Sequence, residues 1–423
     1  NLILTTVSGS QLVDAETLKQ GIQLNLNSML ASQLQIGYMV GTGTPPYRGF
    51  TSPRDSIIVA PDLTNFYQLV TREYEIDGFF ARNGVPEGLR TVLIVGPKGR
   101  FTDYELFQLD QFLMRGGSLI MFLDAYDIGI SGNQATYDER RTGIEEMIEH
   151  YGVRLTRSYL LDKQSYVIND IDSSGIAMQI PIYSAPLITD DQINTDFPFL
   201  RNIDNMVFQN VSPVELVERM PENVTAFPLI QSSESAWVLA GDLTLENPFS
   251  AAPPPESQLS QYTIAYLLEG RFESYFAGRA LPAPPVDGES DDVGDQVTAA
   301  RDLQRVIAAS PDFIPLSSGG QLIVIGASSV LGANILDAEG HSPASLFLLN
   351  AIDFMNGREG VAEMRAKASR IRPLEATTPF VRGFTKAFNI AGVPMIVVVV
   401  GLVVWLFYRA RRRRVQRLFA GKT

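Results

Sequence analysis

The residues that could do chemistry lie where apolar runs of the sequence end. Parallel α/β sheets build their sites at the carboxyl ends of their strands, so side chains in the turns after such runs are the first candidates. Carboxylates in these turns could transfer protons or bind a cation, and a hydroxyl beside an imidazole could act as a nucleophile. The candidate ligand site consists of the polar residues in these turns: Thr42, Asp124, Asp127, Ser328 and His341.

Each candidate also has a structural interpretation. Asp124 and Asp127 follow the run LIMFL, where a carboxylate often caps a helix or hydrogen-bonds a loop. Ser328 lies in GASSV, which has valine at the last position of the nucleophile motif G-x-S-x-G. Lys98 lies in the loop GPKG, which lacks the spacing of a phosphate-binding loop. We therefore predict no catalytic residue, no bound metal and no cofactor.

Composition excludes several kinds of site. The chain of 423 residues has no cysteine and only two histidines, which excludes disulfides, thiolate metal sites and multi-histidine metal sites. The net charge is −13, and residues 409–423 carry seven Lys or Arg and no acid, so residues 1–408 carry −13 − 7 = −20. An acidic body repels phosphates, so we predict no nucleic-acid partner.

The elements that must position the candidates are clearest around residues 91–124. VLIV and LIMFL are continuously apolar, as in parallel strands covered on both faces. Between them, Thr102 and Glu105 have the spacing of a capping box, and Gly116 and Gly117 end the predicted helix. A second helix is predicted over 137–150. The fold class is therefore α/β, with a parallel sheet of the flavodoxin or amidotransferase kind.

The chain is too long for one ordinary domain at roughly 150 residues each. The strand–helix alternation weakens after residue 157 and returns with QLIVIG and the helix that begins at Pro343. The predicted parts are an α/β domain (1–156), a β-rich middle section (157–278), an acidic Pro-rich linker (279–300), a closing α/β section (301–372), a juxtamembrane linker (373–386), a transmembrane helix (387–408) and a basic tail (409–423).

The membrane prediction rests on 22 uncharged residues, 387–408. As a helix they would extend about 33 Å, close to the hydrocarbon thickness of a bilayer. The predicted membrane anchor, in contact with lipid, consists of the interfacial aromatic and basic residues at the end of this segment: Trp405, Tyr408, Arg409, Arg411, Arg412, Arg413 and Arg414. The positive-inside rule places this tail in the cytoplasm and the body on the periplasmic, extracytoplasmic side of the cytoplasmic membrane. An export signal or a first membrane helix is then expected before Asn1.

Three segments together resemble the gliding-motility auxiliary proteins (GldG-like): VLIVGPKGRFTDYELFQLDQFLMRGGSLIMFLDA, PLIQSSESAW and IAYLLEGRFESYF. The section from IVIGASSVLGAN to residue 367 is similar to the closing section of that family. The resemblance covers residues 34–374 and the C-terminal anchor. It implies an extracytoplasmic α/β body beside an ABC permease and its ATPase, with an interaction role. It also implies similarity to a domain of an intraflagellar-transport protein.

The sequence departs from that family at three strand ends. Gly-Thr-Gly-Thr at 41–44 replaces the usual Gly-His-Gly-Glu, Gly-Ala-Ser-Ser at 326–329 replaces Gly-Asp-Ser-Asp, and Gly340-His341 replaces Gly-Asn. A ligand that relatives bind through those groups would not be bound here in the same way.

Two hypotheses follow. In the first, the protein is a non-enzymatic, membrane-anchored auxiliary subunit of an ABC-type transport or gliding-motility complex, which couples its body to the permease and ATPase and contacts an extracytoplasmic protein. In the second, it is an extracytoplasmic ligand-binding protein or hydrolase with a site at the strand ends. The second requires that Asp124 and the turns 41–44 and 326–329 face one deep pocket.

Overall fold

The computed structural model describes the chain in two units, residues 1–369 and 370–423, which are treated separately below. Within them it describes residues 2–6, 9–13, 34–47, 62–131, 134–171, 177–203, 205–240, 244–245, 252–283, 313–368, 386, 388 and 393–419. Most of the predicted acidic linker (279–300) and all of the juxtamembrane linker except Lys386 lie outside these ranges.

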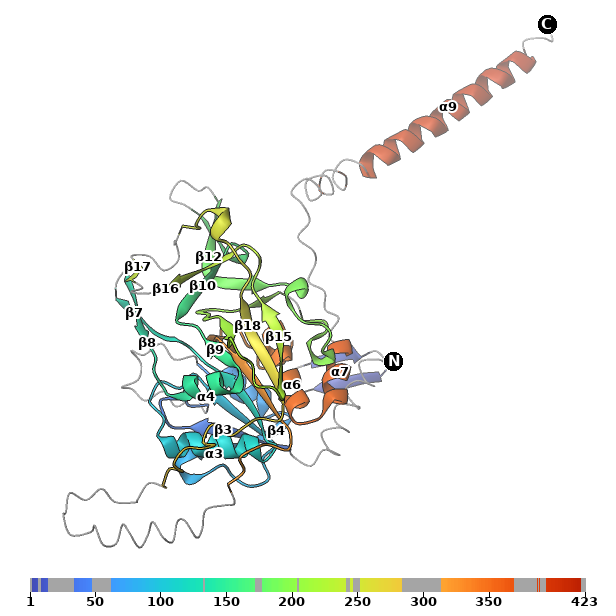
Figure 1. The fold of residues 1–423 in the computed structure, drawn as a ribbon. Coiled ribbons are helices and arrows are strands. Elements are labelled where there is room, and N and C mark those ends of the chain that lie inside the picture. Colours follow the sequence, from blue (N-terminus) through green and yellow to red (C-terminus); the bar gives the residue numbers. More distant parts are fainter. Residues whose placement is uncertain are drawn as a thin grey trace, which may run out of the picture. The chain divides into compact units, whose positions relative to one another are not determined.

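A seven-stranded sheet forms the centre of the first unit (Figure 1). Its strand order is β15-β18-β19-β6-β5-β3-β4. The five strands from β19 to β4 pair in parallel, and β18 and β15 add an antiparallel edge. The strands are β3 (Leu34–Val40), β4 (Tyr74–Phe80), β5 (Thr91–Val95), β6 (Ser118–Phe122), β15 (Val224–Gln231), β18 (Thr263–Gly270) and β19 (Gly320–Ile325). The predicted α/β class with a parallel sheet is confirmed.

Helices cover both faces of this sheet, and Figure 1 shows α3 and α4 on the opposite side of the strands from α6 and α7. The helices are α2 (Thr64–Val70), α3 (Asp103–Met114), α4 (Ile144–Tyr151), α6 (Pro343–Met355) and α7 (Glu359–Ala368). Successive residues of β5 belong to different cores: Val92 and Ile94 pack with α3 and α4, whereas Leu93 and Val95 pack with α2 and α6. This two-sided burial explains why the strands are apolar at every position.

Local signals in the sequence account for how the two main helices begin. At α3, Glu105 N–H donates to Thr102 Oγ1 (3.3 Å) and Thr102 N–H donates to Glu105 Oε2 (2.9 Å), so the predicted capping box is present. At α6, Ser342 Oγ accepts from Ser345 N–H (3.2 Å), and Pro343 occupies the first helical position. Both caps satisfy amide groups that a helix start leaves without a partner.

The middle of the chain is rich in short antiparallel strands. These are β7 (Tyr126–Ser131), β8 (Gln134–Glu139), β9 (Val153–Leu155), β10 (Ser158–Asp162), β11 (Ser165–Ile171), β12 (Ala177–Ile188), β13 (Met206–Val207), β14 (Val214–Leu216), β16 (Ala236–Ala240) and β17 (Thr244–Leu245). A separate hairpin at the N-terminus contains β1 (Leu2–Thr6) and β2 (Gly9–Val13). Single-turn 3-10 helices lie at Ala81–Asn83, Asp190–Gln192, Pro198–Leu200, Glu256–Gln258 and Ser329–Leu331.

One predicted helix is wrong in its first half. Residues 137–139 belong to β8, where Tyr137 pairs with Ile128 and Glu139 with Tyr126, and α4 begins only at Ile144. Gly143, with φ of +91°, separates the two elements. The antiparallel partner β7 therefore decides the conformation of 137–139, and the local pattern does not.

The second unit contains α9, Val393–Phe419. Among the described residues, no helix combines the length and the apolar character that a bilayer crossing requires, so the predicted transmembrane helix over 387–408 is unsupported. The described part of the uncharged run, Val393–Tyr408, extends about 24 Å at 1.5 Å per residue, and the arginines from Arg409 onward continue the same helix. Residues 387 and 389–392 of the prediction lie outside the described ranges.

The residues of the predicted membrane anchor lie on α9. The side chains of Trp405 and Tyr408 are exposed within their unit. The guanidinium carbon of Arg409 lies 5.0 Å from the centroid of the Trp405 ring, in cation–π range. Arg411, Arg412, Arg413 and Arg414 follow on the next turn of α9.

Candidate functional site

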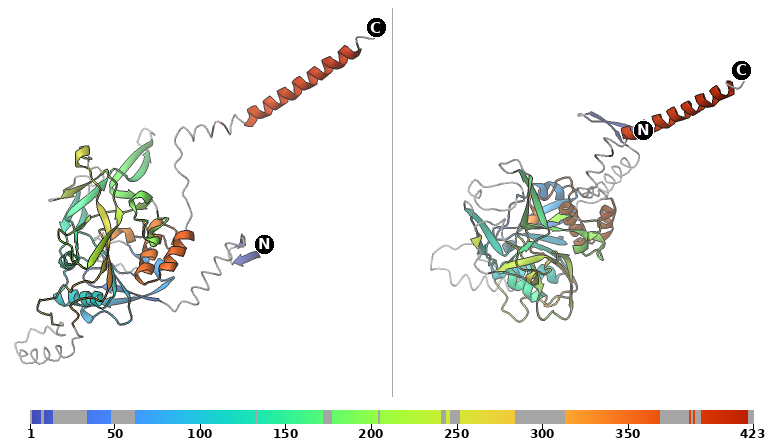
Figure 2. Two further views of the ribbon diagram at one scale, coloured as in Figure 1. Left: turned by 45° about the vertical axis from the view of Figure 1, so that its right-hand side comes forward. Right: turned by 90° about the horizontal axis from the view of Figure 1, so that it is seen from above.

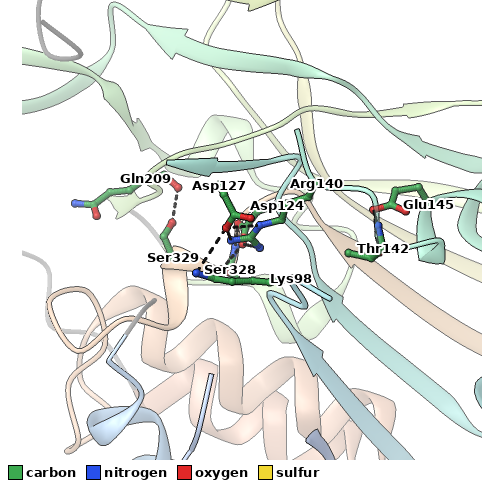
Figure 3. Close-up of polar contacts among 9 residues, drawn as sticks. All are labelled: Lys98, Asp124, Asp127, Arg140, Thr142, Glu145, Gln209, Ser328 and Ser329. Carbon is green, nitrogen blue, oxygen red and sulfur yellow. Dashed lines mark hydrogen bonds and ion pairs between the residues drawn. The ribbon is translucent and has the colours of Figure 1, made fainter. Parts of the chain in front are cut away.

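The carboxyl ends of β5, β6 and β19 bring part of the predicted ligand site together (Figure 3). Asp124, just beyond β6, accepts two hydrogen bonds from Ser328, just beyond β19: one from its backbone N–H (2.7 Å) and one from its hydroxyl (2.6 Å). Asp124 Oδ2 also accepts from Arg140 Nη1 at 2.7 Å. Asp124 and Ser328 therefore meet at one edge of the sheet.

Asp127 joins the same group through Arg140. Its Oδ1 lies 3.0 Å from Arg140 Nε and 2.9 Å from Arg140 Nη2, and 3.6 Å from Lys98 Nζ. Two carboxylates thus face one guanidinium and one ammonium, so the formal charges cancel. We call Lys98, Asp124, Asp127 and Arg140 the strand-end cluster.

Burial differs across the strand-end cluster. The side chains of Arg140 and Asp124 are 6% and 11% exposed, whereas that of Asp127 is 41% exposed. Burial lowers the pKa of the Lys98 ammonium; Asp127 opposes this shift and Arg140 adds to it. The buried pair of Arg140 and Asp124 is therefore the centre of the cluster, and Lys98 and Asp127 form its rim.

A glycine makes the close approach of the two strand ends possible. Gly96 has φ of +46°, and a Cβ there would lie 2.9 Å from Ser328 Oγ and 3.3 Å from Asp124 Oδ2. A side chain at this position would have to displace the hydrogen bond between Ser328 and Asp124. Gly96, the first glycine of GPKG, thus allows the ends of the strands to pack closely.

Thr42 lies next to the strand-end cluster but contributes its backbone to it. The carbonyl of Thr42 accepts hydrogen bonds from the backbone N–H groups of Lys98 (2.9 Å) and Gly99 (2.7 Å). Its hydroxyl donates to the Gly41 carbonyl at 2.7 Å. The turn after β3 therefore holds the loop that carries Lys98.

His341 does not join these residues. Its imidazole is exposed, and Nδ1 lies 3.8 Å from a carboxylate oxygen of Asp337. Burial alone would raise the pKa of the Asp337 carboxyl, but hydrogen bonds from the backbone N–H groups of His341 and Ser342 hold that pKa well below its usual range. The segment therefore forms the entry to α6.

Arg140 is the residue that the sequence analysis missed. It follows β8, and its backbone N–H donates to the Ala125 carbonyl at 2.8 Å. The pairing of β7 with β8 folds this arginine back onto Asp127 and Asp124, which lie 13 and 16 positions earlier. The sequence predicts one helix over 137–150, so no local signal marks Arg140 as the partner of these carboxylates.

The strand-end cluster lines neither of the two best-formed hollows. The larger, a groove of about 260 Å³, lies at the opposite, amino ends of β5, β6 and β19, beside Arg90, Gly116 and Ser118. The smaller, about 40 Å³, lies beside His150 and Glu273. Over the described parts of the chain, no group of three or more His, Asp or Glu side chains is placed to hold a metal ion. The arrangement is an ion-pair network that joins strand ends, and its residues line neither of these two hollows.

Comparison with known families identifies the chain. A family model described as an auxiliary component of an ABC-type uncharacterized transport system (ABC_transp_aux) matches residues 33–340. The chain belongs to this family. The match runs from the start of β3 to the turn before α6, so it includes the whole strand-end cluster.

Other comparisons are distant. No curated protein matches the chain. The structure titled mmIFT52 N-terminal domain has 10% identity and a TM-score of 0.41, over 76% of this chain and 97% of that one. The exo-beta-1,4-mannosidase Op5Man5 from Opitutaceae bacterium strain TAV5 has 10% identity and a TM-score of 0.27, over 86% of this chain and 42% of that one. These likenesses carry no functional argument.

A second ion network joins the two closing helices, which lie beyond the segment matched to the ABC auxiliary family, to residues 73 and 74 within that segment. Asp353 of α6 is fully buried and accepts from Arg365 Nη1 of α7 at 2.6 Å and from the Tyr74 hydroxyl. Arg365 Nη2 also donates to Glu73 at 2.6 Å, and Arg358 Nη1 lies 3.3 Å from Asp353. We call Glu73, Asp353, Arg358 and Arg365 the helix cluster. It ties the two closing helices to the start of β4.

Proposed function

We propose that this protein is a non-enzymatic auxiliary subunit of an ABC-type transport or gliding-motility complex, and that it binds the permease and ATPase subunits. The family match over residues 33–340 is the observation that carries this proposal. An ATPase elsewhere in the complex changes the conformation of the permease, and the subunit passes that change to an extracytoplasmic protein partner.

The chemistry of the strand ends supports an interaction role. Each carboxylate of the strand-end cluster is engaged by a cation, and Asp124 also accepts both donors of Ser328. A general base or a cation site needs carboxylate oxygens that a substrate or ion can reach. These oxygens instead hold the ends of three strands together, which suits a rigid body that transmits force.

We further propose that the body works on the extracytoplasmic side of the cytoplasmic membrane and that the arginines after Tyr408 lie in the cytoplasm. The large apolar side chains of α9 are exposed within their unit, which favours contact with lipid. This orientation requires the uncharged residues before Val393 to complete the crossing, because sixteen residues are too few. The −20 charge of residues 1–408 suits steering toward a basic partner surface.

Co-purification tests the proposed function. The tagged full chain, extracted from its native membranes in mild detergent, is expected to bring down an ABC permease and an ATPase, identified by mass spectrometry. Recovery of the chain alone would contradict the subunit proposal. If the complex assembles and its deletion abolishes surface gliding without affecting export, the complex serves motility.

Membrane attachment is tested separately with a matched pair of variants. Leu402→Asp places an acid on the exposed apolar part of α9, and Thr225→Asp places the same acid on an exposed position of β15 in the body. We expect the first variant to move from the membrane fraction to the soluble fraction and the second to stay with the membranes. Equal behaviour of the two would contradict attachment through α9. Protease digestion from either side of the membrane then reports on which side the body lies.

A further inference from the structure

The hairpin of β11 and β12 exposes apolar side chains in a way that the auxiliary-subunit proposal does not explain. Figures 1 and 2 show β12 as the long green strand at one end of the first unit. Tyr166 is 52% exposed, Val167 38%, Ile168 45% and Met178 47%. Large apolar side chains gathered on one hairpin in this way are typical of an interaction surface.

The register places most of these side chains on one face. Tyr166 pairs with Ile182 and Ile168 pairs with Ile180, while Met178 lies opposite Asp170. Directly opposed residues of an antiparallel pair point to the same face, and residues two apart along a strand share it. Tyr166, Ile168, Ile180 and Met178 therefore form one apolar stripe.

β11 also has the backbone of an edge strand. It stands at the end of a three-stranded sheet ordered β11-β12-β13, and in the described part of the chain no strand pairs with its outer side. Its sequence, SYVINDI, contains no lysine and no proline, and the two features that discourage further pairing, a register shift between Ser165 and Tyr166 and the charge of Asp170, lie on either side of the central residues 167–169. Residues 166–170 are all exposed. Such an edge is a template for another extended strand.

We propose that β11 pairs antiparallel with β11 of a second copy of this chain, about a two-fold axis through Val167. In this register Tyr166 of each copy lies opposite Ile168 of the other, on the same face, so the two apolar stripes join. Val167 faces its own counterpart. The strand is therefore complementary to itself, as a two-fold interface requires.

Charge favours this antiparallel arrangement. Asp170 is the single charged residue of β11. In the proposed pairing the two Asp170 residues lie three positions to either side of the axis, about 20 Å apart at 3.4 Å per residue. In a parallel, in-register pair they would lie only about 4.8 Å apart on neighbouring strands, where like charges repel.

The absence of cysteine from the sequence permits a direct test. In antiparallel pairs the Cα atoms of opposed residues are about 4.5 or 5.5 Å apart, within the range that a disulfide spans. The full-length Val167→Cys variant, purified in detergent at low concentration and oxidised mildly, is expected to form a disulfide-linked dimer. The control is Thr225→Cys, an exposed position on β15, which is an edge strand of the main sheet. It should stay monomeric on non-reducing gels.

The second measurement places opposite charges on the two copies at positions 166 and 168 and follows dimer formation. Chains carrying Tyr166→Lys with Ile168→Lys, and chains carrying Tyr166→Glu with Ile168→Glu, should each be monomeric by light scattering. Their equimolar mixture should recover the dimer, because each lysine then faces a glutamate. Unchanged thermal melting shows that both variants fold.

Three outcomes would overturn the proposal. The first is that the Val167→Cys variant forms no cross-link, and the second is that the Thr225→Cys variant cross-links equally well. The third is that the Val167→Cys variant cross-links only to a different polypeptide in native membranes. None of these tests depends on the permease or the ATPase, so the pairing can fail while the auxiliary-subunit proposal stands.

Discussion

The strand-end cluster and the helix cluster contain the same kinds of ions in different surroundings. The carboxylates differ most in burial: Asp124 and Asp127 of the strand-end cluster are 11% and 41% exposed, whereas Asp353 of the helix cluster is 0% exposed. The arginines are both largely buried, with Arg140 6% and Arg365 16% exposed. In the strand-end cluster Arg140 lies 13 positions after Asp127 and 16 positions after Asp124 in the sequence. In the helix cluster Arg365 lies 292 positions after Glu73. A buried charge that loses its partner cannot recover hydration, whereas an exposed one can. The helix cluster should therefore dominate stability, although the strand-end cluster occupies the position where α/β proteins build sites.

The largest effect is expected from Arg365→Met. The change removes the 2.6 Å contact to Asp353 and leaves that buried carboxylate with Arg358 and Tyr74 alone. Breaking a buried pair on one side costs about 3–5 kcal/mol. Urea denaturation followed by circular dichroism measures the loss.

The matched control is Arg154→Met, which breaks the pair between Arg154 and Glu149, whose side chains are 50% and 45% exposed. A loss of about 0–1 kcal/mol is expected there. Similar losses for Arg365→Met and Arg154→Met would show that burial does not separate the two kinds of ion pair.

Asp124→Asn should have the next largest effect. The amide keeps the shape of the carboxylate but removes the charge that faces Arg140, and one of its two groups can no longer accept from Ser328. Hydrogen bonds to charged groups contribute about 1.5–3 kcal/mol. Asp127→Asn, at the exposed rim, should cost less than about 1 kcal/mol. If urea denaturation shows a larger loss of unfolding free energy for Asp127→Asn than for Asp124→Asn, then Asp124 is not the centre of the strand-end cluster.

Gly96→Ala tests whether the strand-end cluster depends on a residue without a side chain at position 96. The methyl group would meet Ser328 Oγ, and the left-handed backbone adds about 1–2 kcal/mol of strain for a residue with Cβ. Gly88→Ala is the control, because Gly88 has φ of +86° but no atom within 4 Å of the added Cβ. Thermal melting should show a larger fall in melting temperature for Gly96→Ala than for Gly88→Ala. Equal losses would mean that contact with Ser328 adds nothing.

The smallest effect should appear only as a function of pH. Backbone donors hold the pKa of Asp337 below its usual value, so its contribution to stability is fully present above the unfolded carboxyl pKa of about 3.9 and is lost as pH falls below it. The advantage of the wild type over Asp337→Asn should therefore shrink as the pH falls from about 4 to about 2 in urea denaturation. If the stability advantage of the wild type over Asp337→Asn grew as the pH fell, the backbone hydrogen bonds to Asp337 would be contradicted.

Much of the local structure could be predicted from short stretches of sequence. The apolar strands β5 and β6, the capped start of α3 and the cap of α6 each follow from neighbouring residues. Tyr137 is the opposite case, because its strand depends on a partner in β7. Of the five predicted site residues, Asp124, Asp127 and Ser328 joined one network, Thr42 supplied only its backbone to the neighbouring loop, and His341 lay elsewhere.

What the sequence by itself determined is what short-range physics controls: the apolar runs that become buried strands, the helix caps, the charge balance and the absence of thiol chemistry. Only the tertiary structure decided which charges meet. Arg140 reaches Asp124 because β8 pairs with β7, and Arg365 reaches Glu73 because α7 packs against α6. Such pairings depend on chain closure over many residues, and no local pattern of side chains specifies them.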